Sequence, residues 1–172
     1  MKEGLALSKI VILTLVLLFS GCTMSSTDEP NGDTDIPIGL YVSSSGDQEY
    51  SSIQDAIDAA PENYTVYVFS GMYNETVVIN KTIQLMGEDP STTIIDAKKL
   101  GAVIKITDAE YCNVSGFTIQ NAGSNQAGLD MRSGNNNISN NIIKDNTNGI
   151  NSNAVKYNIY FLAFNKFNLI AR

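Results

Sequence analysis

The residues of this sequence that could carry out chemistry on a substrate are mostly acidic. Asp96, Asp108, Asp130 and Asp145 are spread along the second half of the chain, and no acidic residue follows Asp145. Paired carboxylates suit the cleavage of polysaccharides, because one group acts as base or nucleophile and the other transfers a proton. Asp130 and Arg132 are two residues apart, so in a strand their side chains would point to the same side.

The sequence contains no histidine, the commonest general base and transition-metal ligand. Cys22 lies at the end of an apolar N-terminal segment, which leaves Cys112 as a lone thiol. We expect Cys112 to pack as a small apolar residue. Two cysteines placed in this way build neither a zinc site nor a disulfide framework. The sequence therefore predicts no metal site and no cofactor.

The charge balance bears on possible partners. Lysine and arginine number 11 against 18 acidic residues, which gives a formal net charge of −7 over 172 residues. Nucleic-acid phosphates require a basic face, so we expect no nucleic-acid partner. The length is that of one domain.

A repeated segment organises the chain and would position these residues. Residues 113–119 return as 137–143, a step of 24, and again as 158–164, a step of 21. Short repeats rich in β-branched residues, Gly and Asn are typical of a solenoid of parallel strands. We predict an all-β, right-handed parallel β-helix with a period of 21–24 residues. Equivalent residues should stack in three columns: Ile95, Ile119, Ile143 and Phe164; Val114, Ile138 and Ile159; and an asparagine ladder of Asn113, Asn137 and Asn158.

The repeat also indicates which side chains lie beside the acidic residues on neighbouring coils. Asp130 has Asn151 as its neighbour one period later, and Asp145 has Asn121 and Lys166 one period away on either side. None of these neighbours is acidic. The spacing therefore predicts no catalytic residues of the two-carboxylate kind.

Local patterns predict the remaining elements. Residues 51–60 form an amphipathic pattern, with Ser51 and Gln54 at capping-box spacing and Pro61 at the end. We expect this helix to cover the N-terminal hydrophobic end of the solenoid. A turn is expected at 70–75, and strands at 66–69, 76–79, 82–86, 93–95 and 102–106.

The first 22 residues are typical of an export signal, with an apolar run at 10–19. Small residues directly before Cys22 match a lipobox, except that Phe19 stands where leucine is usual. The pattern predicts lipidation of Cys22. A signal that is simply cleaved, or an uncleaved anchor, remains the alternative.

The polar segment that follows contains too little apolar surface to fold by itself. Residues 23–38 are predicted to be a flexible linker, and residues 39–172 the β-helix domain. The pattern leaves open whether that domain is truncated at its C-terminal end. We expect an exported protein on the cell surface, attached to the membrane through a lipid or signal anchor.

Five segments together resemble a known superfamily: 52–60, 70–75, 83–87, 93–96 and 116–119. Their order is similar to that of the pectin-lyase-like right-handed β-helix proteins, over roughly residues 40–150. The opening resembles pectin methylesterases. The Asn-rich later coils resemble NosD-like surface repeats, also called carbohydrate-binding and sugar-hydrolase (CASH) domains. The resemblance implies the fold; one fold hosts many functions.

The resemblance to pectin methylesterases also implies a set of site residues. These enzymes use an aspartate nucleophile, a second aspartate, oxyanion-site glutamines and an arginine for the uronate carboxylate. Gln126-Ala127 stands where they carry a Gln-Ala pair, and Asp145 lies near their first aspartate motif. No second aspartate follows, and the only later arginine is Arg172. These departures put esterase activity in doubt.

Three glycosylation sequons, at Asn63, Asn74 and Asn80, lie beside predicted turns and are candidate glycan acceptors. Those at Asn113 and Asn137 belong to the predicted ladder. We expect a non-catalytic surface module that binds carbohydrate or cell-envelope components or has a structural role. The alternative is a polysaccharide-modifying enzyme of the lyase, hydrolase or pectin-esterase type, or an inactive N-terminal fragment of one.

Overall fold

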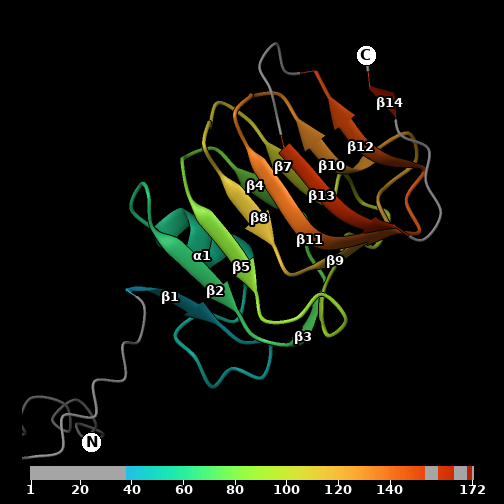
Figure 1. Cartoon of the computed structure of the whole chain (residues 1–172). Coiled ribbons are helices and arrows are strands. Elements are labelled where there is room, and N and C mark those ends of the chain that lie inside the picture. The colour runs from blue at the N-terminus through green and yellow to red at the C-terminus, as the bar shows by residue number, and fades with distance from the viewer. Residues whose placement is uncertain (1–37, 154–158, 165–169, 172) are drawn as a thin grey trace, which may run out of the picture. The chain divides into compact units, whose positions relative to one another are not determined.

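The structure is a computed structural model that describes residues 38–153, 159–164 and 170–171 (Figure 1). The predicted signal with Cys22, and nearly all of the predicted linker, lie outside the described residues, as do Asn158 and Lys166. Within the described part, no helix is long and apolar enough to span a membrane.

The chain from residue 38 onward winds into coils of parallel strands. The first face holds β1 (Gly39–Val42), β2 (Thr65–Val68), β5 (Gln84–Gly87), β8 (Asn113–Ser115) and the start of β11 (Asn137–Lys144), which lie side by side in Figure 1. The second face holds β3 (Gly71–Tyr73), β6 (Thr93–Asp96), β9 (Thr118–Gln120) and the end of β11. The third face holds β4 (Val77–Ile79), β7 (Ile104–Ile106), β10 (Ala127–Met131), β12 (Asn148–Ser152) and β14 (Ile170–Ala171).

Together with β13 (Ile159–Phe164), which pairs with β11, these strands make about five turns. Every strand pair is parallel, which confirms the predicted parallel β-helix.

The interior is filled by aliphatic columns. Ile95 pairs with Ile119, Ile119 with Ile143, and Ile143 with Phe164. The three isoleucines are fully buried. Val114 likewise pairs with Ile138. Branched side chains stacked at strand spacing exclude water from the coils whose burial is described, so burial of these columns supplies the main driving force for folding.

The third repeat corrects one predicted column. Ile159 pairs with Asn137 rather than with Ile138, whose partner is Tyr160. The register shifts because Asn140 has no partner in β13; it is an extra residue with a left-handed φ of 51°. A bulge of this kind makes the repeat step one residue longer before Asn140 than after it. Phe164 therefore keeps the 21-residue step, whereas the column of Ile159 does not.

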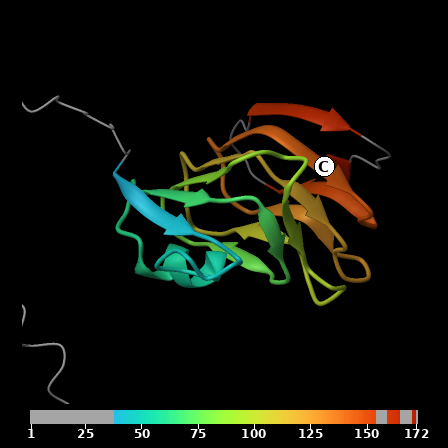
Figure 2. The ribbon, with the colours of Figure 1, turned by 90° about the horizontal axis from the view of Figure 1, so that it is seen from below.

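Helix α1 (Ile53–Ala59) lies at the same end of the stack as β1 and β2 (Figure 2). Its N-cap is Ser52, one residue later than predicted, and the Ser52 Oγ accepts from the Asp55 N–H at 3.3 Å. Glu75 accepts the Ile53 and Gln54 N–H groups at 2.9 and 3.0 Å. The predicted capping box is therefore wrong, because a carboxylate from the next coil satisfies these helix N–H groups instead.

The predicted turn at 70–75 contains strand β3, which pairs with β6. Ser-Gly signalled a turn, but Tyr73 is buried and its hydroxyl donates to the Phe69 carbonyl at 2.8 Å. Burial against the core thus overrides the local turn preference. The five other predicted strands overlap β2, β4, β5, β6 and β7.

Three buried or half-buried asparagines connect neighbouring coils. The side-chain oxygens of Asn136, Asn141 and Asn146 accept the backbone N–H of the residue 24 positions earlier, at 2.8–3.0 Å. The Asn141 and Asn146 amides also donate to carbonyls 27 positions earlier. The three N–H groups lie at the bends, where strand pairing is interrupted, and the asparagine oxygens supply the acceptors that they need there. Asn113 and Asn137 make only a side-chain contact of 3.3 Å with each other outside the core.

Candidate functional site

The first candidate site is centred on Asp130, on the outer side of the third face. Leu129 and Met131 point into the core, so the intervening Asp130 points outward. The strand register places Asp130 beside Lys105 on the preceding coil and Asn151 on the following coil. The neighbouring position one period away therefore holds an amide, as the repeat predicts.

Both oxygens of Asp130 are engaged by side chains of this chain. Arg132 donates from Nε and Nη2 to Oδ2, each at 3.3 Å, and Asn151 Nδ2 donates to Oδ1 at 2.9 Å. Asp130 itself is only 5% exposed. The guanidinium and the amide hold this carboxylate in position, but among the described residues no second carboxylate that could transfer a proton lies beside it.

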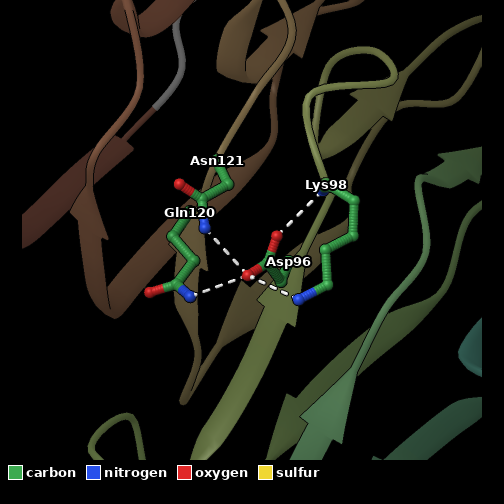
Figure 3. A network of polar contacts seen from close by, with 4 residues as sticks. All are labelled: Asp96, Lys98, Gln120 and Asn121. Carbon is green, nitrogen blue, oxygen red and sulfur yellow. Dashed lines mark hydrogen bonds and ion pairs between the residues drawn. The ribbon is translucent and has the colours of Figure 1, made fainter.

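The second candidate site is centred on Asp96, at the end of β6 (Figure 3). Oδ1 accepts the Lys98 N–H at 2.8 Å. Oδ2 accepts from Gln120 Nε2 at 3.0 Å and Asn121 Nδ2 at 2.8 Å, with Lys98 Nζ at 3.5 Å. Four donors therefore surround one buried carboxylate, an arrangement that fixes the turns of two neighbouring coils.

The pKa of Asp96 is lowered from its ordinary value of 3.8. Burial acts in the opposite direction, but the hydrogen bonds from Lys98, Asn121 and Gln120 and the charge of Lys98 outweigh it. A carboxylate with a depressed pKa and saturated oxygens is a poor proton donor and a poor nucleophile. The Asp96 cluster is therefore best explained as a structural brace.

This depressed pKa predicts a pH-dependent contribution to stability. Above pH 3.8 the ionised Asp96 stabilises the folded form, and this stabilisation is lost as the pH falls through the lower pKa of the folded state. Asp96→Asn, which turns amide donors toward Gln120 and Asn121, should lower the free energy of unfolding most at neutral pH. Urea unfolding measured from about pH 7 down to about pH 3 should show that the difference in free energy of unfolding between the variant and the wild type becomes smaller as the pH falls. A gap of constant size would contradict the assignment.

The structure keeps the other sequence-predicted residues apart. Asp145 is exposed after β11 with a φ of 56°, and its backbone carbonyl accepts from Lys99 Nζ at 3.2 Å. Its predicted neighbour Asn121 donates its side chain to Asp96 instead. Gln126 is exposed before β10, and Asp108 is exposed after β7. These residues lie in different turns and do not converge on Asp130.

Sulfur and metal chemistry gain no support from the described residues. Cys112 is buried, and burial raises the pKa of its thiol. The described part of the chain contains no group of three or more Cys, Asp or Glu side chains that could hold a metal ion. The candidate glycan acceptors Asn63, Asn74 and Asn80 are all exposed.

Some partners in these clusters could not be found from the sequence. The repeat step indicated Asn151 beside Asp130, but Asp96 has partners in two turns whose residues have left-handed backbone conformations. Nothing in the sequence indicated the buried contacts of Asn136, Asn141 and Asn146, because their side-chain oxygens accept from backbone N–H groups rather than from other asparagines.

Comparison with known proteins shows the fold. No protein-family model matches the chain, and no curated protein sequence matches it. A solved pectin methylesterase from carrot is similar with a TM-score of 0.60 and 22% identity, covering 74% of this chain and 44% of the carrot chain. A pectin methylesterase mutant in complex with a hexasaccharide has a TM-score of 0.58 and 16% identity, covering 67% and 46%. The chain therefore has the β-helix fold of pectin methylesterases and spans less than half the length of these structures.

Proposed function

We propose that the chain is an exported β-helix module that binds polysaccharide at the cell surface and does not turn it over. The fold it shares with pectin methylesterases supports a relation to polysaccharides. The observation that carries the non-catalytic part is the environment of Asp130. Its neighbours on the adjacent coils are Lys105 and Asn151, and its oxygens are occupied by Arg132 and Asn151.

A carboxylate in this environment can bind but lacks a partner for catalysis. Hydrolysis or acyl transfer by paired carboxylates needs one group as nucleophile or base and a second as proton donor. Asp96 cannot supply the second group, because it lies on a different face and its own oxygens are saturated. An exposed arginine beside hydrogen-bonding amides suits recognition of sugar hydroxyls or carboxylates.

We therefore expect the purified full-length chain to release neither methanol nor new reducing or unsaturated ends from methylated pectin and polygalacturonate. The measurement is a time course of these products compared with a blank. Asp130→Ala and Asp145→Ala are matched controls, each removing one outward carboxylate. Turnover by the wild type that is lost in either variant would overturn the non-catalytic proposal.

The rival proposal is a polysaccharide-modifying enzyme, or an inactive front fragment of one. The observation that favours it is that both solved neighbours are pectin methylesterases with chains more than twice as long as the part matched here. Asp130 itself is buried, but Arg132, which donates to it, is exposed, so a substrate could reach the surroundings of this carboxylate. The turnover assay separates the binding module from an active enzyme, because only an active enzyme requires product.

The anchoring proposal rests on the residues around Cys22. Small residues before this cysteine and the polar segment after it support lipidation. Cys22→Ser is expected to move the protein from the membrane fraction to the medium, or to leave it unprocessed, because serine cannot carry the thioether-linked lipid. Fractionation and intact-mass measurement check this. A variant that is processed and membrane-bound like the wild type would refute lipidation.

A further inference from the structure

The outer side of the first face carries no charged side chain at ten successive outward positions. Alternate residues of β1, β2, β5, β8 and β11 point inward, as Val66, Leu85, Val114 and Ile138 do, all at 0% exposure. The outward positions form two columns across the coils. We call this surface the uncharged platform.

In one column the side chains change from aromatic rings at one end to hydroxyl groups at the other, along the axis of the β-helix. Tyr41 pairs with Tyr67, Tyr67 with Met86, Met86 with Ser115, and Ser115 with Ser139. None of the five is fully buried, although each directly follows a residue that is buried in the core or packed against it. The other column runs through Gly39 and Thr65 to the three amides Gln84, Asn113 and Asn137.

The aromatic end of the platform is already ordered. The ring centroids of Tyr41 and Tyr67 are 5.3 Å apart with 15° between the ring planes, and those of Tyr41 and Phe69 are 6.2 Å apart with 25°. A Cβ at Gly39 would lie 2.8 Å from a Tyr67 ring carbon, so that ring lies against the glycine. Phe69 remains 38% exposed. Rigid aromatic surface binds with little loss of side-chain entropy.

The amide end retains hydrogen-bonding capacity. Asn137 Nδ2 donates to Asn113 Oδ1 at 3.3 Å, and Gln84 Nε2 donates to the Tyr111 carbonyl at 3.5 Å. A primary amide has two donor hydrogens and an oxygen with two lone pairs, so these contacts leave further donors and acceptors on each side chain. The amides recur once per coil, about 4.8 Å apart.

The charge around the platform decides what kind of ligand it could take. Residues 38–95, which contain its aromatic end, include eight acidic side chains and one lysine. A polyanion such as a uronate polymer would be repelled from this end of the molecule. A neutral ligand avoids that repulsion and needs no ionic partner on the platform.

We propose that the uncharged platform binds a neutral polysaccharide that runs along the helix axis. The apolar faces of its pyranose rings contact Tyr41, Tyr67 and Phe69, and its hydroxyls bind the amides of Gln84, Asn113 and Asn137. This inference rests on the proposed polysaccharide-binding function and names its surface and ligand class. Binding should change little with ionic strength, because no charged pair contributes.

The test is calorimetric titration of the purified full-length chain with cellohexaose, chitohexaose and hexagalacturonate. We expect binding of one or both neutral oligosaccharides, and binding to hexagalacturonate at least about tenfold weaker. Tyr67→Ala removes a ring, and Ser115→Asp places a charge in the middle of the platform. Each should weaken neutral binding by about tenfold or more. Asn153→Asp adds the same charge after β12 on the third face and should leave binding unchanged.

The outcomes separate the two levels of the proposal. Urea unfolding first establishes that each variant is folded. If Tyr67→Ala does not fold, Ser115→Asp alone tests binding at the platform. Oligosaccharide binding that survives in the folded platform variants overturns the platform and leaves the proposed function standing. Preference for hexagalacturonate also overturns the platform. Absence of binding by every oligosaccharide overturns both. A wild-type dimer that the platform variants convert to a monomer, without glycan binding, would identify the occupant as a second copy.

Discussion

Replacement of Asn141 by alanine is expected to lower the free energy of unfolding by about 2–5 kcal/mol, since each buried polar group left unpaired costs about 1–3 kcal/mol. Asn141 is fully buried. Its oxygen accepts the Phe117 N–H at 3.0 Å, and its amide donates to the Val114 carbonyl at 2.8 Å. Alanine would leave the Phe117 N–H unpaired at the bend between β8 and β9, and it would remove a donor from the Val114 carbonyl.

The matched control is Asn137→Ala, four residues earlier in the same strand. Asn137 is exposed, and its amide makes only a 3.3 Å contact with Asn113. Its loss should change the free energy of unfolding by no more than about 0.5 kcal/mol. Urea unfolding of both variants gives the comparison. Equal small losses would show that the buried asparagine does not connect the coils.

Ile119→Ala is expected to cost about 2–5 kcal/mol, the range for large-to-small changes in a packed core. Ile119 is fully buried and is paired with Ile95 on one side and Ile143 on the other. Rigid strands on both sides restrict collapse around the missing atoms, so a cavity remains. Unfolding in urea, with the slope compared to wild type, measures the loss.

Leu100→Ala is the suitable control for the column, because Leu100 is 83% exposed. An effect within about 0.5 kcal/mol is expected. Glu88, although exposed, is a poor control, because it accepts from both the N–H and the hydroxyl of Ser70 at 2.8 Å. A cost at Ile119 as small as that at Leu100 would contradict the stacked column.

The aliphatic columns could be predicted from the sequence because each repeat brings the same side of a strand to the same place. Ile95, Ile119 and Ile143 are separated by 24 residues, and the structure pairs them at that step. A continuous buried column fixes the register, because a shift of one residue between neighbouring strands would turn the apolar side chains outward. The repeat therefore predicted both the fold and the strand register over three coils.

The position of the asparagine contacts could not be predicted, because the bends break the alternation of a strand. Gly116 has a φ of 85° and Asn140 a φ of 51°, so the side on which the next residue points changes at these places. The pattern matched Asn113 with Asn137, which do pair, but the core contact is made by Asn141, just beyond the bend. The bulge at Asn140 moved Ile159 out of its predicted column for the same reason.

The candidate sites were only partly predictable. The spacing of Asp130 and Arg132 correctly predicted side chains on one side of a strand, and the structure joins them in an ion pair at 3.3 Å. The surroundings of Asp96 come from turns whose left-handed residues include two lysines. Lysine carries no strong sequence signal for that conformation. Prediction of the uncharged platform would have required the register of five strands, and the repeat indicated that register for only two of them.

Native mass spectrometry of the full-length chain with oligosaccharides of defined length tests the central claim most directly, because one spectrum reports both the complex and any product. Binding without turnover predicts complexes that contain the oligosaccharide at its unchanged mass, and free oligosaccharide that stays intact during incubation. Shortened or demethylated oligosaccharides that appear with the wild type and disappear with Asp130→Ala would contradict the account.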